Sequence, residues 1–171
     1  MSSSVSSAPR PAAGAPEVSV VMSAFNDAVT LPAALESILS QQGVELEFIV
    51  VDDGSTDGSA AILDEAARKD ARLKVVHRPN AGLTRALIAG CALASAPWIA
   101  RQDADDVSQP GRLAALLDLA RRRPQVVLLA SAAWCTGPHG ERLREVAVET
   151  DPARARQQLL AARTGPPAHG S

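Results

Sequence analysis

Acidic residues are concentrated at two points of this sequence, where their spacing could hold a cation or a polar ligand. Six of the 19 acidic side chains fall into two short clusters. The clusters are Asp52, Asp53 and Asp57, and Asp103, Asp105 and Asp106. Crowded carboxylates repel one another, so each cluster costs stability unless a cation or hydrogen-bond donors compensate it. Asp103 and Asp105 are two residues apart, which points both side chains to one side of an extended chain and suits Mg²⁺ or Mn²⁺.

Each cluster taken alone has a simpler interpretation, as a solvated turn in which an Asp caps a helix. Asp57 keeps this interpretation, as the N-cap of the next helix. For Asp53, Asp103 and Asp105, the presence of both clusters in one alternating chain favours a ligand site. A receiver domain also collects carboxylates at strand ends. It would need a lone phosphorylatable Asp and a late-strand Lys, and no Lys follows Lys74.

Predicted strands and helices alternate along most of the chain, and both clusters lie where strands end. Apolar β-branched runs predict strands, and apolar residues spaced by three and four predict helices. We expect strands at 18–23, 46–51, 73–77, 98–102 and 126–130, and helices at 31–39, 59–68, 83–94 and 112–123. This order is typical of an α/β fold with a mainly parallel, Rossmann-like sheet and helices on both faces. Ligands bind such sheets outside the carboxyl ends of the strands.

The two ends of the chain lack these patterns. Residues 1–16 are rich in Ser, Ala and Pro without an apolar core, so we expect a disordered tail and no signal peptide. Residues 17–131 form the expected α/β domain, and residues 132–171 a partial continuation of it. In that continuation we expect a turn at 131–140, an edge strand at 143–148, a helix at 152–162 and a disordered C-terminal end.

Composition excludes several classes of protein. The 171 residues suffice for one domain, and 46% hydrophobic with 21% charged residues is typical of a globular chain. A net charge of −2 and 2% aromatic residues argue against a nucleic-acid partner. No apolar stretch reaches the ~20 residues of a transmembrane helix. Cys91 and Cys135 lack metal or redox spacing, so we expect both to be reduced and buried, in the cytosol.

Four segments, in their order and at their spacing, resemble the family 2 glycosyltransferases. They are Val18–Asn26, Phe48–Gly58, Asn80–Leu83 and Ile99–Asp106 with Pro110–Leu113. The resemblance covers residues 17 to about 131. It implies a GT-A fold that is cut off after its nucleotide-binding half, a nucleotide-diphosphate-sugar donor and a divalent cation, Mg²⁺ or Mn²⁺. It further implies transfer of the sugar, with inversion, to a saccharide or lipid-linked acceptor; a UDP-sugar is a family tendency.

The resemblance also implies roles for residues of the first two segments. Phe25 takes the place of the aromatic side chain that packs beside the nucleotide base. Ser23 and Asn26 lie in the same donor-facing loop. Asp53 matches the carboxylate that accepts a hydrogen bond from the base.

In the last segment, Asp103 and Asp105 match the Asp-x-Asp motif of the family. The resemblance places Asp103 near the ribose and Asp105 on the metal. Arg112 belongs to the Pro-x-Arg-Leu continuation of the motif. An alternative for Arg112 is a helix-surface arginine that pairs with Asp106 or Asp118.

The chain departs from the family pattern in the helix after residues 80–83, where Ile88 stands in place of a frequent Asn. Any polar contact from that helix is therefore in doubt. Arg85, Arg101 and His77 could contact a diphosphate or a base, but we interpret them as exposed or edge-strand residues.

The general base that an inverting transferase needs is not identified. Glu149 and Asp151 are the late acidic residues, and neither lies in a context that matches the family's base. A non-catalytic remnant or fragment that binds nucleotide sugars but lacks the acceptor half is therefore an alternative. A second alternative is a structural domain whose acidic loops only cap helices. We expect a cytoplasmic protein, either free or peripheral to the inner face of the membrane.

Overall fold

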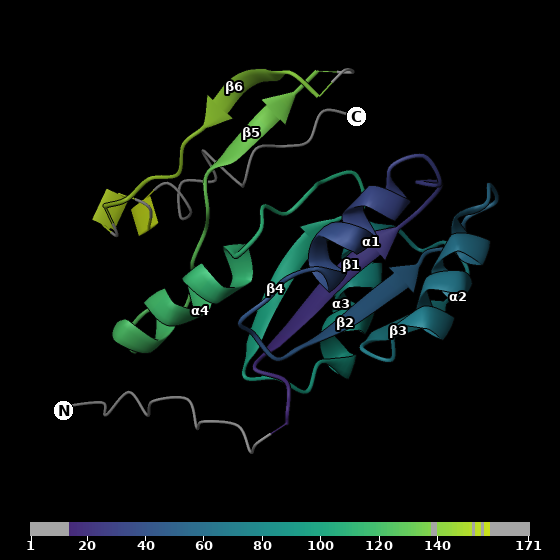
Figure 1. The fold of residues 1–171 in the computed structure, drawn as a ribbon, viewed down its shortest axis with the longest axis horizontal. Coiled ribbons are helices and arrows are strands. Elements are labelled where there is room, and N and C mark those ends of the chain that lie inside the picture. Colours follow the sequence, from purple (N-terminus) through teal and green to yellow (C-terminus); the bar gives the residue numbers. More distant parts are fainter. Residues whose placement is uncertain (1–13, 138–139, 152, 155, 158–171) are drawn as a thin grey trace. The chain divides into compact units, whose positions relative to one another are not determined.

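A four-stranded parallel sheet with helices on both faces forms the first of two units of the chain (Figure 1). The structure is a computed structural model, and it describes residues 14–137, 140–151, 153–154 and 156–157. The strands are β1 (Val18–Ala24), β2 (Leu46–Asp52), β3 (Leu73–His77) and β4 (Trp98–Asp103), in the order β3-β2-β1-β4. The helices are α1 (Leu31–Leu39), α2 (Ser59–Lys69), α3 (Leu83–Leu93) and α4 (Arg112–Arg122). All eight elements lie within one residue of their predicted bounds, and the predicted α/β fold is confirmed.

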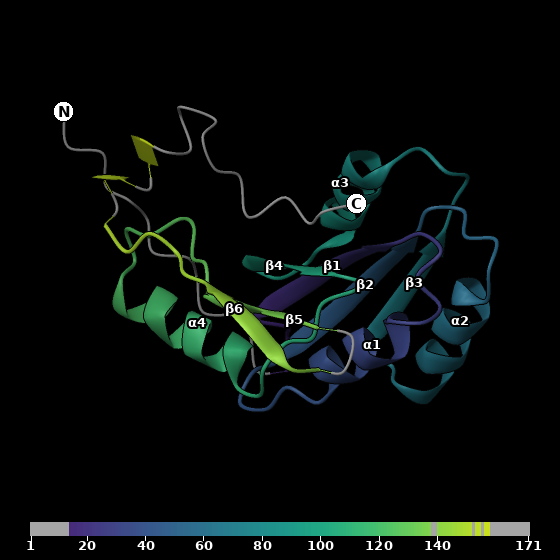
Figure 2. The same ribbon diagram turned by 90° about the horizontal axis from the view of Figure 1, so that it is seen from above.

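The central strands are buried on both faces, which explains why their sequences are continuous apolar runs. Every residue of β2 is buried. On one face, Val20 and Phe48 belong to a core with Leu35 of α1, Leu63 of α2 and Leu117 of α4. Figure 2 shows α1, α2 and α4 on this side of the sheet and α3 on the other.

Helix α3 packs closely on the second face because Gly90 has no side chain. A Cβ atom at Gly90 would lie 2.6 Å from Cγ1 of Val21 and 3.4 Å from Cγ2 of Val51. The first distance is too short for any side chain, so the helix approaches β1 and β2 only with glycine at this position.

A buried carboxylate joins the amino ends of the strands. Glu47 Oε1 accepts hydrogen bonds from Ser19 Oγ at 2.6 Å and from the backbone and side chain of Ser95, each at 2.7 Å. Its Oε2 lies 2.6 Å from Nζ of Lys74, and Ser19 Oγ accepts a hydrogen bond from Ala96 N at 3.0 Å. Burial alone would raise the pKa of Glu47, but the hydrogen bonds from Lys74, Ser19 and Ser95 outweigh it and lower the pKa to about 2.

The second unit, which begins at Val127, contains an antiparallel hairpin of β5 (Ala133–Thr136) and β6 (Arg142–Val146). The predicted edge strand at 143–148 corresponds to β6, but the prediction of a turn over all of 131–140 is wrong because β5 lies there. The predicted strand at 126–130 is also wrong. Val127 is 87% exposed and Leu128 66% exposed, and no strand within the described ranges pairs with this run. Apolar residues favour a strand only where a partner strand is present.

Several predictions at the ends of the chain are not tested. Residues 1–13 of the predicted tail, and most of the predicted helix at 152–162, lie outside the described residues. The predicted domain boundary at residue 131 lies a few residues beyond Val126, where the first unit ends.

Cys91 and Cys135 are both free, but both are exposed, so the prediction that they are buried is wrong. Cys91 follows the buried Gly90 and is turned away from the sheet by the helical rotation of α3. Cys135 lies in β5, all of whose residues are exposed. In the described part of the chain, no helix is long and apolar enough to cross a membrane.

We expect Glu47→Gln to lower the free energy of unfolding at neutral pH by about 2 kcal/mol, because it removes the charge of a buried, multiply hydrogen-bonded carboxylate. The pKa of Glu47 falls from 4.5 to about 2 on folding. Its contribution is therefore complete above about pH 4.5 and is lost as the pH falls toward 2.

Urea denaturation of the wild type and of Glu47→Gln, at about pH 6 and about pH 3, measures this difference. The difference should shrink at the lower pH. Glu65→Gln, at an exposed i,i+4 pair with Lys69, is the control and should change little. A Glu47→Gln effect that is equal at both pH values contradicts the interpretation.

Candidate functional site

The carboxyl ends of β2 and β4 lie on either side of the carboxyl end of β1. Ser23 pairs in register with Val51 on β2 and with Asp103 on β4, and Ala24 pairs with Asp52. The two acidic clusters follow the two strands that flank β1. They are therefore at the same edge of the sheet.

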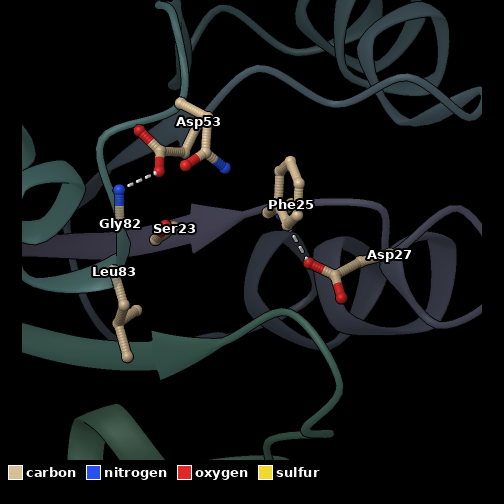
Figure 3. Close-up of a pocket in the computed structure, with 7 residues that line it drawn as sticks. Ser23, Phe25, Asp27, Asp53, Gly82 and Leu83 are labelled. Carbon is tan, nitrogen blue, oxygen red and sulfur yellow. Dashed lines mark hydrogen bonds between the residues drawn. The ribbon is translucent and has the colours of Figure 1, made fainter.

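A pocket lies at this edge, walled by the loops after β1, β2 and β3 (Figure 3). Its volume is about 210 Å³, smaller than the ~300–1,000 Å³ typical of sites that enclose a whole ligand, so it can receive one part of a larger ligand. The lining residues are Ser23, Phe25, Asp27, Asp53, Asn80, Gly82 and Leu83. Phe25 is 47% and Leu83 52% exposed, which leaves apolar surface available to a flat ligand group.

Asp53 is buried in the pocket wall, and the segment before α3 holds its carboxylate. Both oxygens lie 3.1 Å from Ala81 N, and Oδ2 accepts a shorter hydrogen bond, 2.7 Å, from Gly82 N (Figure 3). Nε of Arg78 is 3.3 Å from Oδ1. Sequence reasoning missed Arg78; its signal is a basic residue directly after a strand. Asp53 thus joins the loop after β2 to the loop after β3.

The turn after Asp53 requires glycine. Gly54 has a φ of +83°, and a Cβ atom there would lie 2.7 Å from Asn80 N and 3.2 Å from the carbonyl oxygen of Arg78. Both the left-handed backbone and the close approach of the two loops exclude a side chain. Gly54 therefore allows the contact that Asp53 makes with the loop after β3.

Asn26 anchors the loop after β1 to the loop after β2. It has a φ of +59°, which Asn tolerates better than most residues. Its Oδ1 accepts a hydrogen bond from Thr56 N at 2.8 Å, and its own N–H donates to Ser55 Oγ at 3.0 Å. Asn26 itself is exposed and is not one of the lining residues.

The prediction that Asp57 is the N-cap of α2 is wrong by one residue, because Gly58 occupies the N-cap position and Asp57 directly precedes it. Asp57 Oδ1 accepts hydrogen bonds from Ser59 N at 2.9 Å and Ser59 Oγ at 2.6 Å, and Oδ2 accepts one from Ala28 N at 3.0 Å. The bonds from Ser59 and Ala28 lower the pKa of Asp57.

Asp27 lines the pocket, and sequence reasoning missed it. Its Oδ2 accepts a hydrogen bond from Phe25 N at 2.8 Å (Figure 3). Burial raises the pKa of Asp27, the bond from Phe25 opposes this, and the charges of Asp105 and Asp57 raise the pKa further. Asp105 therefore acts electrostatically on a pocket wall. The signal for Asp27 is an acidic residue within the loop that follows β1.

The Asp-x-Asp segment carries Asp103 at the end of β4 and the exposed Asp105 in the next loop. Asp103 accepts two hydrogen bonds from Arg101, at 2.8 Å from Nε and 2.9 Å from Nη2. No group of three His, Cys, Asp or Glu side chains gathers as a metal site among the residues described. The oxygen donors of Asp103 and Asp105 fit a hard cation, and the rest of its coordination would come from ligand and water oxygens.

Arg112 at the start of α4 fixes the loop that carries these acids. Its Nη1 donates to Ser108 Oγ at 2.9 Å and Gln102 Oε1 at 3.3 Å. Burial lowers the pKa of Arg112, while the charge of Asp106 raises it. Arg112 is thus a partly buried scaffold residue, whereas Asp118 pairs with another arginine of α4.

A family model described as Glycosyl transferase family 2 matches residues 19–169. YibD of Escherichia coli, described as an uncharacterized glycosyltransferase, is 30% identical over 155 residues, which are 86% of this chain and 45% of YibD. ExoO of Rhizobium meliloti, a succinoglycan biosynthesis protein, is 40% identical over 106 residues, 61% of this chain and 30% of ExoO. The chain thus spans less than half the length of these relatives.

Two solved structures share the fold. The mannosyltransferase PcManGT of Pyrobaculum calidifontis, in complex with GDP-Man and Mn²⁺, matches with a TM-score of 0.57 and 28% identity over 61% of this chain and 32% of that chain. A fragment of S. aureus TarS in complex with UDP-GlcNAc matches with a TM-score of 0.59 and 24% identity. This match covers 63% of this chain and 32% of the TarS fragment. The TarS likeness concerns the fold alone. These matches confirm the GT-A type of fold.

We expect Asp53→Asn to lower the free energy of unfolding by about 2 kcal/mol, because the amide NH₂ group would face N–H donors and leave Arg78 unpaired in the pocket wall. Urea denaturation measures the loss. Asp118→Asn, at an exposed pair on α4, is the matched control and should change stability by less than about 0.5 kcal/mol. Equal effects of the two substitutions would show that Asp53 does not hold the loops together.

Proposed function

This chain belongs to glycosyl transferase family 2, and on that premise we propose that its sheet unit binds the nucleotide of a nucleotide-diphosphate sugar for transfer of the sugar to an acceptor hydroxyl. The main support is the position of the pocket. It lies at the carboxyl edge of the sheet, where the loops after β1, β2 and β3 meet and the Asp-x-Asp loop follows the neighbouring strand. This is the edge at which parallel α/β sheets bind ligands.

We propose that the pocket receives the nucleotide base. The half-exposed ring of Phe25 offers a face on which a base can pack, and Ser23 lies on the adjoining wall. Ala81 N, Gly82 N and Arg78 hold the carboxylate of Asp53 in the pocket wall. The role proposed for Asp53 is to accept a hydrogen bond from an N–H of the base. Asn26 contributes by holding the loop of Phe25.

We propose that Asp105 binds a divalent cation, Mg²⁺ or Mn²⁺, and that Asp103 lies near the ribose. PcManGT, at 28% identity, is a structure with GDP-Man and Mn²⁺. When bound, the ion would supply positive charge to the diphosphate that leaves as the glycosidic bond breaks. The pKa of Asp27 is raised mainly by burial, and the negative charges of Asp105 and Asp57 raise it further. A cation at this edge would relieve that repulsion.

The acceptor side has no assigned residue. Asp151 Oδ1 accepts hydrogen bonds from Ala153 N at 2.8 Å and Arg154 N at 3.3 Å, and Asp151 N donates to Glu149 Oε1 at 2.9 Å. These contacts cap a helical turn, so neither acid is proposed as the general base. We propose a saccharide or lipid-linked hydroxyl as acceptor and inversion as outcome, following the family.

We also propose a cytoplasmic location, which two free cysteines suit. A peripheral position at the membrane stays a prediction.

We expect the protein to bind GDP or UDP with Mn²⁺, and Asp105→Asn to weaken the Mn²⁺-dependent binding about tenfold or more, because a carboxylate ligand is lost. Isothermal titration with and without Mn²⁺ measures both affinities. Asp106→Asn, which removes a neighbouring charge of the same loop, is the matched control. If the wild type shows no metal-dependent heat with either nucleotide, the proposed function is wrong.

Arg101 should compete with the donor and its cation for Asp103. We expect Arg101→Gln to tighten Mn²⁺-dependent nucleotide binding about threefold, because the guanidinium no longer neutralises that carboxylate. Its stability should change little, since the Arg101 side chain is 45% exposed. The same titration tests this effect. Weaker binding would instead mean that Arg101 holds Asp103 in its binding position.

A further inference from the structure

A series of hydrogen bonds runs from α2, across the end of β3, to the loop after β1. Asp64 Oδ1 lies 3.0 Å from Nε2 of His77, and Nδ1 of the same ring lies 2.8 Å from Asp52 Oδ2. Asp52 Oδ1 accepts a hydrogen bond from Ser55 N at 3.0 Å, and Ser55 Oγ accepts one from Asn26 N at 3.0 Å. We call these five residues the His77 network. None of the five residues lines the pocket, and the proposed function uses only Asn26, which holds the loop of Phe25.

The His77 ring lies between two carboxylates, one on each ring nitrogen. An ionised carboxylate accepts hydrogen bonds and cannot donate them. Both ring nitrogens must therefore carry a proton for both bonds to form, which makes His77 an imidazolium cation. The bonds to Asp52 and Asp64 raise the pKa of His77, and burial opposes them. For the buried Asp52, burial would raise the pKa, but bonds from Ser55 and His77 outweigh it and lower the pKa.

The charged groups that face the His77 ring come from the two elements packed against β3. They are Asp52 from β2 and Asp64 from α2. The next residue, Arg78, directs its guanidinium elsewhere, with Nε 3.3 Å from Asp53 and Nη1 donating to the carbonyl oxygen of Arg85 at 3.0 Å. The charge of His77 therefore acts mainly on the two carboxylates.

The far end of the network sets two walls of the pocket. Asp52 directly precedes Asp53, so its position along β2 fixes where the Asp53 side chain begins. Asn26 directly follows Phe25, and its bonds to Ser55 and Thr56 fix the loop that presents the ring. A change in how the Asp52 side chain is held would therefore reach Phe25 through Ser55 and Asn26.

We propose that His77 is a positioning residue of the donor site, which as an imidazolium holds Asp52 and, through it, Ser55 and Asn26 in the arrangement that binds the nucleotide. His77 itself touches no ligand. Because the folded state raises the pKa of His77, the protonated arrangement is complete below the usual value of about 6.5 and is lost as the pH rises through the higher folded value. Nucleotide binding should weaken over that upper range. This inference rests on the proposed function, which supplies the nucleotide as the ligand.

The test compares Asp64→Asn with Glu65→Gln in otherwise intact protein. Asp64→Asn removes one of the two carboxylates from His77 and lies on α2, away from the pocket. Glu65→Gln removes the next carboxylate of the same helix, which bonds to Lys69. Two readouts are followed from about pH 6 to about pH 8.5. One is the NMR signals of the His77 ring and of the Ser55 and Asn26 amides, and the other is the dissociation constant of GDP or UDP with Mg²⁺.

We expect the ring and both amides to titrate with one midpoint above about 6.5, and Asp64→Asn to lower that midpoint. At pH values between the two midpoints, His77 is protonated in the wild type and neutral in Asp64→Asn. The ratio of dissociation constants, Asp64→Asn over wild type, should therefore reach about fivefold there, the effect of roughly one charge-assisted hydrogen bond, and approach one on either side. Glu65→Gln should give a ratio near one throughout. Ionisation of the nucleotide cancels in these ratios.

A second variant, His77→Gln, keeps the side chain neutral, so its dissociation constant should exceed that of the wild type about fivefold at about pH 6 and approach it at about pH 8.5. A ratio that is independent of pH, or amide signals that do not follow the ring, would overturn the role of His77. Absence of nucleotide binding by the wild type at every pH would instead overturn the proposed function. The amide signals would then still decide whether His77 sets the position of the loop.

Discussion

Parallel pairing of β1 with both β2 and β4 is the constraint on which the site depends. The three strands run in one direction, so their carboxyl ends and the loops that follow them share one edge. Residues that are 50 positions apart, Asp53 and Asp103, are thereby placed on either side of Ser23. Antiparallel pairing of either neighbour would send its acidic cluster to the opposite edge.

The carboxylates of this edge are compensated to different degrees. Asp53 is held by backbone amides and Arg78, and Asp57 by donors from the start of α2 and the loop before α1. These two stabilise the loops without a ligand. Asp27 is different, because its pKa is raised by burial and by neighbouring charges that include Asp105. The charge of Asp105, in the loop after β4, thus acts on Asp27 in the loop after β1.

The sequence predicts the sheet unit well because each of its elements has its own local signal. Apolar runs end at a polar residue, as at Ser23, Asp52 and His77, and helices begin after a polar residue or Gly. The second unit is predicted poorly because its signals are ambiguous without a partner strand. The apolar run 126–130 reads as a buried strand, but the described structure leaves it exposed and unpaired. Cys91 was misjudged for a related reason, since the type of residue does not show which side of α3 it occupies.

Within the site, the sequence identifies the residues that the strand ends present, and it misses those that hold them. Asp53 and Asp103 follow apolar runs and are visible as a pattern. The partners His77 and Arg78 lie together at the end of β3 and Asp27 lies in the loop after β1, and no spacing rule connects them to the acids. The two ends of the sheet also differ. At the amino end, both oxygens of the Glu47 carboxylate accept hydrogen bonds from within the protein, so Glu47 contributes to stability and to no proposed ligand site. The carboxyl end keeps its acids only partly compensated, which costs stability and leaves them able to gain from a ligand.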